Sequence, residues 1–126
     1  MPEHTPLFVH DRLLGREQRR LAHRLFLPVS TCSGNPALAE DPFVTPDALY
    51  AALTAAGQDL TFIEHVRAVA PTPDDTTALR VPTGAAVLLT RRVITSSDGR
   101  PLALEETRRN AEDAQLTYPL TPTVSD

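Results

Sequence analysis

The sequence predicts an α+β fold in which an antiparallel sheet is flanked by helices. Helical patterns dominate the first half of the chain and a strand hairpin the second, a segregation typical of α+β domains. An Asp98-Gly99 pair between two apolar runs is the strongest hairpin signal in the chain. The chain has 126 residues, of which 41% are hydrophobic, and this suits one domain with a modest core.

The first part of the chain is expected to hold a basic helix and a loop. Leu14, Leu21 and Leu25 fall on one face of a helix over residues 13–25, and arginines fill much of the remaining surface. This basic surface is either solvated or in contact with a phosphate or another domain. Prolines interrupt residues 28–43, which we expect to form a loop.

The clearest helix is predicted over residues 45–57. Thr45 is placed to cap its first turn, Asp47 complements the helix dipole, and Gly57 ends the helix. The buried side of this helix is expected to be Leu49 and Leu53.

Strand patterns occupy most of the remaining chain. Residues 60–69 alternate as a strand, and residues 72–84 read as a short helix, capped by Thr72, and a turn. Residues 85–95 and 100–109 form the two strands of the Asp98-Gly99 hairpin. We expect residues 114–120 to add a last strand.

The hairpin turn decides where the adjacent acids Glu105 and Glu106 point. With Asp98 and Gly99 as the central residues of a type I′ turn, Arg92 lies opposite Glu105 and Arg91 lies opposite Glu106. Neighbouring strand residues point to opposite faces of a sheet, so the two glutamates cannot act together as a carboxylate dyad. The face of Arg92 and Glu105 is expected to carry Thr90, Ile94, Ala103 and Thr107; the face of Arg91 and Glu106 is expected to carry Leu89, Val93, Leu102, Leu104 and Arg108.

Two interpretations of these Arg–Glu pairs remain open. Arg92 and Glu105 have small and hydroxyl-bearing neighbours, so they either line a polar cavity or form a plain cross-strand ion pair. In a cavity, the guanidinium would bind a carboxylate or phosphate, and the carboxylate would accept hydrogen bonds from hydroxyl or amine groups. Arg91 and Glu106 are expected at the margin of the core, because their face is mostly aliphatic and should pack on helices.

Residues 49–120 resemble a known protein family. The segment "LYAALTAAGQDLTFIEHVRAVAPTPDDTTALRVPTGAAVLLTRRVITSSDGRPLALEETR" is similar to the UTRA effector domain of GntR-type transcription regulators of the HutC subgroup. The shared features are a helix that ends in Gly57, a strand with Glu64, the capped helix at 72–79, the Val81–Leu88 segment and the Asp98–Pro101 turn.

The resemblance implies a chorismate-lyase-like fold that binds a small metabolite, such as a sugar phosphate or carboxylate, in a cleft beside the sheet. It also implies a homodimer whose ligand controls DNA binding by a linked winged helix-turn-helix domain. The family's ligand-contacting arginine and glutamate match Arg92 and Glu105, although the register could select Arg91 instead. Arg67 and Glu64 are further candidates for the site.

We expect residues 1–44 to be an N-terminal extension that cannot supply the winged-helix domain, and residues 45–126 to be the effector-binding domain. DNA contact would then require a missing or partner domain. An enzyme on the same scaffold, acting on a small carboxylated metabolite, is a second possibility, and a purely structural dimerisation module is a third. No nucleophile–base couple strengthens the enzyme interpretation.

Composition narrows the function further. The net charge of −4 disfavours an autonomous nucleic-acid binder. All basic residues are arginine, which excludes a Schiff base on lysine, and the single cysteine, Cys32, excludes an internal disulfide. No apolar run is long enough for a transmembrane helix and no signal pattern is present, so we expect a cytoplasmic protein without a metal or cofactor.

Overall fold

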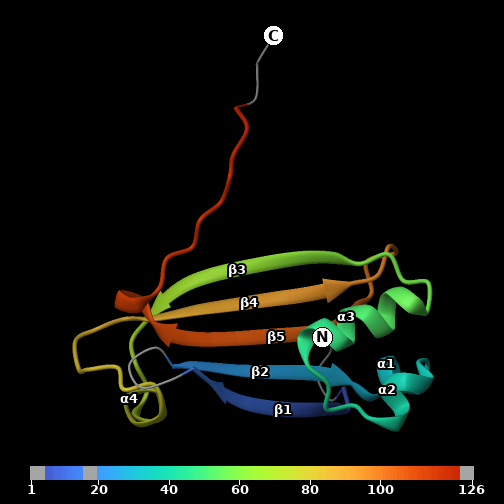
Figure 1. Cartoon of the computed structure of the whole chain (residues 1–126), viewed down its shortest axis with the longest axis horizontal. Coiled ribbons are helices and arrows are strands. Elements are labelled where there is room, and N and C mark those ends of the chain that lie inside the picture. The colour runs from blue at the N-terminus through green and yellow to red at the C-terminus, as the bar shows by residue number, and fades with distance from the viewer. Residues whose placement is uncertain (1–4, 16–19, 123–126) are drawn as a thin grey trace.

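The computed structural model of the chain describes residues 5–15 and 20–122. Its centre is a five-stranded antiparallel sheet in the order β1-β2-β5-β4-β3 (Figure 1). The strands are β1 Leu7–Leu14, β2 Leu21–Pro28, β3 Thr61–Val69, β4 Val87–Thr95 and β5 Pro101–Asn110. The predicted α+β class is therefore confirmed.

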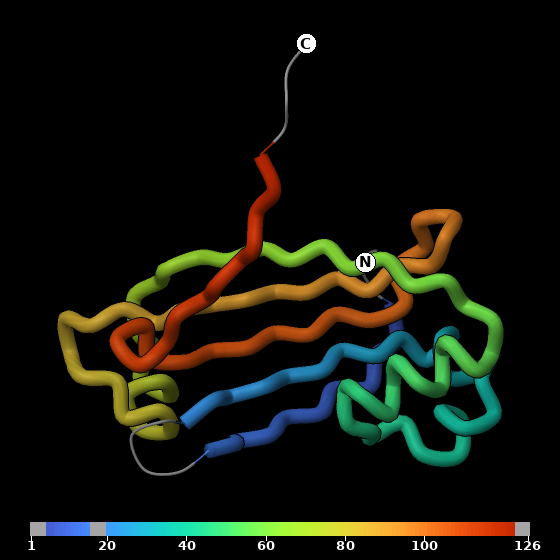
Figure 2. Tube along the Cα trace, turned by 45° about the horizontal axis from the view of Figure 1, so that its top comes forward, coloured from blue at the N-terminus to red at the C-terminus, as the bar shows by residue number. Residues whose placement is uncertain are grey.

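Helices cover part of each face of the sheet (Figure 2). The face that carries Glu105, here called the Glu105 face, packs at one end on α1 Val29–Ser33, α2 Pro36–Glu40 and α3 Pro46–Ala55. The opposite face, here called the Glu106 face, packs on the segment around α4 Pro73–Ala78. A short 3-10 turn, η1 Ala111–Asp113, follows β5. In the part of the chain that is described, no helix is long and apolar enough to cross a membrane.

The two capped helices form as their sequences predict. Thr45 accepts a hydrogen bond from the Ala48 backbone and caps α3, and Leu49 and Leu53 are buried. Thr72 and Asp75 cap α4 reciprocally, since each side chain accepts a hydrogen bond from the other's backbone N–H. Local capping chemistry therefore fixes where both helices begin.

The helix predicted over residues 13–25 is wrong. Its ends belong to β1 and β2, which pair antiparallel, and β2 in turn pairs with β5 (residues 16–19 lie outside the described part). The sequence was ambiguous because Leu21 and Leu25, four residues apart, fit one face of a helix or one face of a strand. His23 and Leu27 complete the strand pattern, because every second side chain from His23 to Leu27 is buried.

Two other predictions also need correction. Residues 28–43 are not simply a loop, because they contain α1 and α2, and Asn35 caps α2. Residues 114–120 do not form a last strand; the C-terminal segment, residues 114–122, leaves the sheet after η1 without pairing to a strand. Its local alternation of apolar residues was not enough to place it in the sheet.

The hairpin register is confirmed through most of its length. Arg92 pairs with Glu105 and Arg91 pairs with Glu106. The turn itself is longer than predicted, since the Ser96 backbone N–H donates to the Arg100 carbonyl at 2.9 Å. A β-bulge between Ile94 and Thr95 compensates for the extra residue and restores the register.

The bulge also changes the position of Leu102. Ile94 pairs with Ala103 and Thr95 pairs with Pro101, which leaves Leu102 as the extra residue of β5. Leu102 and Ala103 both lie in the core that contains Ile94. The prediction that Leu102 shares a face with Glu106 is therefore wrong. The prediction that the Glu106 face packs on helices holds only near α4, because the larger helical layer covers the end of the Glu105 face.

Candidate functional site

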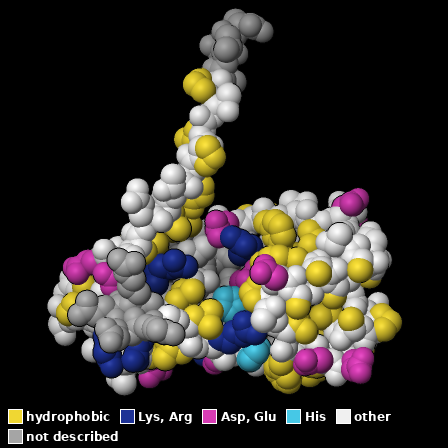
Figure 3. All heavy atoms as spheres, viewed as in Figure 1, with side chains coloured by type: hydrophobic (Ala, Val, Ile, Leu, Met, Phe, Trp, Pro, Cys, Tyr) yellow, Lys and Arg dark blue, Asp and Glu magenta, His cyan; other side chains and the backbone are white. Residues whose placement is uncertain are grey.

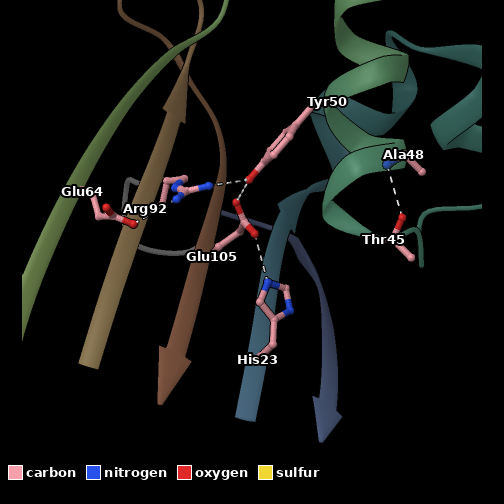
Figure 4. A network of polar contacts seen from close by, with 7 residues as sticks. All are labelled: His23, Thr45, Ala48, Tyr50, Glu64, Arg92 and Glu105. Carbon is pink, nitrogen blue, oxygen red and sulfur yellow. Dashed lines mark hydrogen bonds and ion pairs between the residues drawn. The ribbon is translucent and has the colours of Figure 1, made fainter. Parts of the chain in front are cut away.

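The candidate site is a polar network on the Glu105 face, beside α3 (Figure 4). Glu105, on the central strand β5, is only 6% exposed. His23 approaches it from β2, Tyr50 from α3, and Arg92 from β4 (Figure 4). Three strands and one helix therefore place polar groups at one point above the sheet.

Glu105 is held by two hydrogen-bond donors. His23 Nε2 lies 3.0 Å from Glu105 Oε1, and the Tyr50 hydroxyl donates to Glu105 Oε2. An ionised carboxylate can only accept hydrogen bonds, so this contact places a proton on His23 Nε2. The buried acid thus has a partner at each oxygen.

These contacts shift the pKa of both Glu105 and Tyr50. Burial alone would raise the pKa of Glu105, but the hydrogen bonds from His23 and Tyr50, together with the nearby Arg92 charge, hold it below its ordinary value. Burial and the hydrogen bond to Glu105 raise the pKa of Tyr50 to about 12. At neutral pH the site therefore presents an ionised Glu105 beside a protonated Tyr50.

Arg92 connects this buried acid to the cavity. One of its terminal nitrogens lies 3.1 Å from Glu64 Oε1 on β3, and the other donates to the Tyr50 hydroxyl at 3.4 Å. Its guanidinium also lies over the Phe62 ring, 5.7 Å from the ring centroid. Arg92 faces Glu105 in the sheet but does not ion-pair with it directly, because Tyr50 bridges the two side chains.

A cavity of about 230 Å³ lies over this region, between the sheet and the C-terminal segment. It is lined by Glu64, Thr90, Arg92, Glu105, Thr107, Arg109, Leu116, Thr117 and Tyr118. Figure 3 shows that basic, acidic and histidine side chains gather in a hollow between the helical end of the molecule and the C-terminal segment. Among the described residues, the buried Nε of Arg109 and Nδ1 of His23 have no hydrogen-bond partner. Arg92 and Arg109 both line the cavity, and guanidinium groups there are suited to an anionic guest.

The structure brings together three of the five predicted site residues. Arg92, Glu105 and Glu64 lie on the Glu105 face and line the cavity. Arg91 lies on the Glu106 face and forms an ion pair with Glu106 at 3.2 Å. Arg67 pairs with Leu89, so it also lies on the Glu106 face, away from the cavity.

Sequence reasoning missed His23 and Tyr50. His23 was hidden by the helix predicted over residues 13–25, although the alternation of Leu21, His23, Leu25 and Leu27 indicates a strand. Tyr50 lies next to Leu49 and three residues before Leu53 on a correctly predicted helix. That spacing puts its ring on the flank of the buried side, which was a usable signal for a residue facing the sheet.

A larger cavity, of about 530 Å³, lies between β1, β2, β5 and α4. Its charged side chains are largely satisfied by one another. Arg24 forms two hydrogen bonds to Asp11, at 2.6 and 3.0 Å, and Arg108 forms two to Asp75, at 2.9 and 2.6 Å. The smaller cavity is therefore the better candidate, because the buried acid Glu105 and Arg109, whose Nε has no hydrogen-bond partner, both line it.

The antiparallel sheet, the helices that cover part of each of its faces and the small polar cavity define an α+β domain with a candidate site for a small molecule. The chain belongs to the UTRA domain family, whose model matches residues 3–115. UTRA domains are regulatory ligand-binding domains and not enzymes, so the chain is an effector-binding regulatory domain. The resemblance of residues 49–120 to a UTRA domain is thereby confirmed.

Solved structures share the fold. PhnF from Mycobacterium smegmatis is 18% identical with a TM-score of 0.71, over 94% of this chain and 52% of PhnF. The effector-binding domain of the trehalose repressor TreR from Bacillus subtilis is 10% identical with a TM-score of 0.65, over 92% of this chain and 81% of that domain. A functionally unknown protein from Listeria innocua is 15% identical with a TM-score of 0.70, over 96% of this chain and 53% of that protein. These identities are low, so the likeness shows a common, chorismate-lyase-like fold.

The chain spans about half the length of the Listeria innocua protein and of PhnF. A comparison with curated protein sequences gave no match.

Proposed function

We propose that the chain senses a small anionic metabolite, such as a sugar phosphate or carboxylate, in the cavity over Glu105. The observation that carries this proposal is the cavity itself, in which Arg92 and Arg109 line the wall and Glu105 is ionised below them. The guanidinium groups would bind the anionic group of the effector. Glu105 and Glu64 would accept hydrogen bonds from its hydroxyl or amine groups.

The size of the cavity supports a small effector. Pockets for drug-sized ligands typically have volumes of about 300–1,000 Å³, whereas this one has about 230 Å³. A single sugar ring or a short carboxylic acid suits that volume better than a nucleotide. Leu116 and Tyr118 of the C-terminal segment would cover the effector, so binding would order this segment against the sheet.

We further propose the setting in which this sensor works. The chain would act as a homodimer in the cytoplasm, as part of a HutC-type regulator of the GntR family. Its effector would change how a winged helix-turn-helix domain, linked to it or carried by a partner, holds DNA. Family membership supports the regulatory role, and the low identities to PhnF and TreR leave the effector itself to experiment.

A thermal-shift screen tests the proposed effector class. Glucose 6-phosphate, glucose and small di- and tricarboxylic acids would be compared, with Arg92→Gln as the test variant and Arg91→Gln as its matched control. We expect at least one anionic compound to raise the melting temperature of the wild-type chain, because a ligand at about 100 times its Kd stabilises the folded state by about 2.7 kcal/mol. Arg91→Gln should keep this shift and Arg92→Gln should lose it, since Arg92 lines the cavity and Arg91 does not. Equal shifts in the two variants would place the effector elsewhere.

A further inference from the structure

Arg109 of β5 is a half-buried cation with apolar neighbours on the sheet. It lines the cavity on the Glu105 face, where it stands opposite Leu88 of β4 and Leu21 of β2. Among the residues that the structure describes, no carboxylate forms an ion pair with Arg109. A charge that is partly removed from water without a counter-charge is unfavourable, so an anion bound to Arg109 would offset this cost.

Arg92, the other arginine that lines the cavity, is already compensated. Its guanidinium forms an ion pair with Glu64 at 3.1 Å and donates a hydrogen bond to the Tyr50 hydroxyl. Figure 3 shows basic side chains at separate places around the hollow, with acidic side chains close to one of them. The two guanidinium groups thus differ in their surroundings, and an incoming anion gains more at Arg109, which no carboxylate of the described residues neutralises.

Two threonines lie between these arginines. Thr90 and Thr107 are directly opposite each other in the β4–β5 ladder, and both line the cavity. Thr107 follows Glu105 by two residues and precedes Arg109 by two, so all three lie on one face of β5. Within the described part of the chain, neither threonine hydroxyl forms a hydrogen bond to the protein. Because a hydroxyl group can donate as well as accept, both are free to donate to the oxygens of an anion.

We propose that Arg109, Thr107 and Thr90 form the anion subsite of the cavity, and that the effector lies along β5 with its anionic group at this end. The inference rests on the proposed function and adds an orientation to it. The ion pair of Arg92 and Glu64 then binds uncharged hydroxyl groups at the other end of the effector, since Arg92 supplies donors and Glu64 supplies acceptors without a net charge.

This orientation narrows the class of effector. The Cα atoms of Glu105 and Arg109 are four strand residues apart, which corresponds to about 13 Å along β5. Side chains on these two residues can therefore hold opposite ends of one small molecule. The class that fits is a small polyol with a single terminal anionic group, either a phosphate or a carboxylate. A compound with its charge in the middle of the molecule would leave Arg109 uncompensated.

Melting temperatures of the 126-residue chain in matched salts test the subsite. The probes are sodium phosphate and sodium acetate, compared with sodium chloride at equal ionic strength. The test variant is Arg109→Gln, and the control is Arg67→Gln, an exposed arginine on the Glu106 face. We expect at least one probe to raise the melting temperature of the wild type and of Arg67→Gln above its value in chloride, and Arg109→Gln to lose this rise.

The two probes also distinguish the kinds of anion. A rise with phosphate alone assigns a phosphate to the effector, and a rise with acetate alone assigns a carboxylate. Phosphate also stabilises folded proteins generally, by exclusion from their surface. That general effect is the same in Arg109→Gln, so the comparison of variants removes it.

Three further variants separate anion binding from folding. Arg109→Lys keeps the positive charge and should recover part of the rise in melting temperature. Thr107→Val keeps the shape of the side chain but removes one hydrogen bond, so the apparent Kd of the probe should rise about three- to tenfold. The double variant Arg92→Gln/Glu64→Gln removes an ion pair without changing the net charge of the cavity, and it should keep the rise.

The outcomes distinguish this subsite from the proposed function. A wild-type chain that melts alike in all three salts, or a rise that persists in Arg109→Gln, would overturn the subsite. A rise lost in the Arg92→Gln/Glu64→Gln variant but kept in Arg109→Gln would place the anion beside Arg92, which leaves an anionic effector in the cavity and overturns only its orientation. If no anionic metabolite stabilises the wild type, the proposed function itself fails.

Discussion

Removing the Tyr50 hydroxyl measures how much the buried network contributes to stability. The hydroxyl donates to Glu105 and accepts from Arg92, and the pKa of Tyr50 rises from 10.0 to about 12. Each pKa unit corresponds to about 1.36 kcal/mol, so ionising Tyr50 would cost the folded state at most about 2.7 kcal/mol, and burial causes more of that cost than the hydrogen bond to Glu105 does. Tyr50 is only half-buried, and solvent screening reduces that figure. We therefore expect Tyr50→Phe to lower the free energy of unfolding by about 1–2 kcal/mol at neutral pH, in line with one hydrogen bond to a charged group.

The sign of the effect with pH follows from the same shift. The folded-state pKa of Tyr50 lies above its unfolded value, so the contribution is complete below about pH 10 and is lost as pH rises towards 12. The wild-type chain should lose this stability over that interval, and Tyr50→Phe should not.

Urea unfolding followed by circular dichroism gives the stability, and tyrosinate absorbance gives the titration. The chain has two tyrosines and no tryptophan, so Tyr118→Phe leaves Tyr50 as the single absorbing phenol. Tyr118 is exposed, and its substitution should change the free energy of unfolding by less than about 0.5 kcal/mol. If Tyr50→Phe is as mild as Tyr118→Phe, or if Tyr50 titrates near pH 10, then the hydroxyl is not held by Glu105 as the structure indicates.

Two further predictions concern the fold around the site. Asp75→Asn should lower the free energy of unfolding by about 2–3 kcal/mol at neutral pH, because Asp75 is buried, accepts two hydrogen bonds from Arg108 and caps α4. Asp74 is exposed in the same turn, so Asp74→Asn is the control and should have a small effect in urea unfolding. The hydrogen bonds from Arg108 hold the pKa of Asp75 below its ordinary value, so the stability that Asp75 contributes is present above about pH 4 and is lost on acidification. The free energy of unfolding should therefore fall less steeply at acidic pH for Asp75→Asn than for the wild type. An equally steep fall in both would contradict the ion pair with Arg108. Gly99→Ala should lower the free energy of unfolding by about 1–2 kcal/mol through backbone strain alone, because φ is +82° and no atom lies within 4 Å of the added Cβ; a thermal melt equal to that of the wild type would refute this.

Local sequence signals determined much of this fold. The caps at Thr45 and Thr72 fixed where two helices begin, and Asp98-Gly99 located the hairpin. Arg92 lies opposite Glu105 as predicted because the bulge near the turn offsets the extra turn residue. Because neighbouring strand residues point to opposite faces, Glu105 and Glu106 were then placed on different faces, and Arg92 and Glu105 were placed correctly in the site. The helix caps and the position of the hairpin depend on residues close to one another in the chain, so the sequence specifies them directly.

The sequence did not settle whether residues 21–27 form a helix or a strand. Two leucines four residues apart suit either structure, and the strand forms because it pairs with β5. This pairing is long-range, since His23 and its partner Glu105 are more than 80 residues apart in the chain. The same long-range packing explains why Glu105 forms hydrogen bonds with His23 and Tyr50 and does not ion-pair with Arg92. The burial of Leu102 likewise depends on a bulge that a turn rule cannot foresee.

The sequence alone thus determined the elements with strong local chemistry, the α+β class and the face on which Arg92 and Glu105 lie. Tertiary structure decided the partner of each charged group, because burial makes an unpaired carboxylate unfavourable and selects the donors that can reach it. It also left β3 as an edge exposed on both faces, since exposure depends on what other segments cover and not on the strand's own residues.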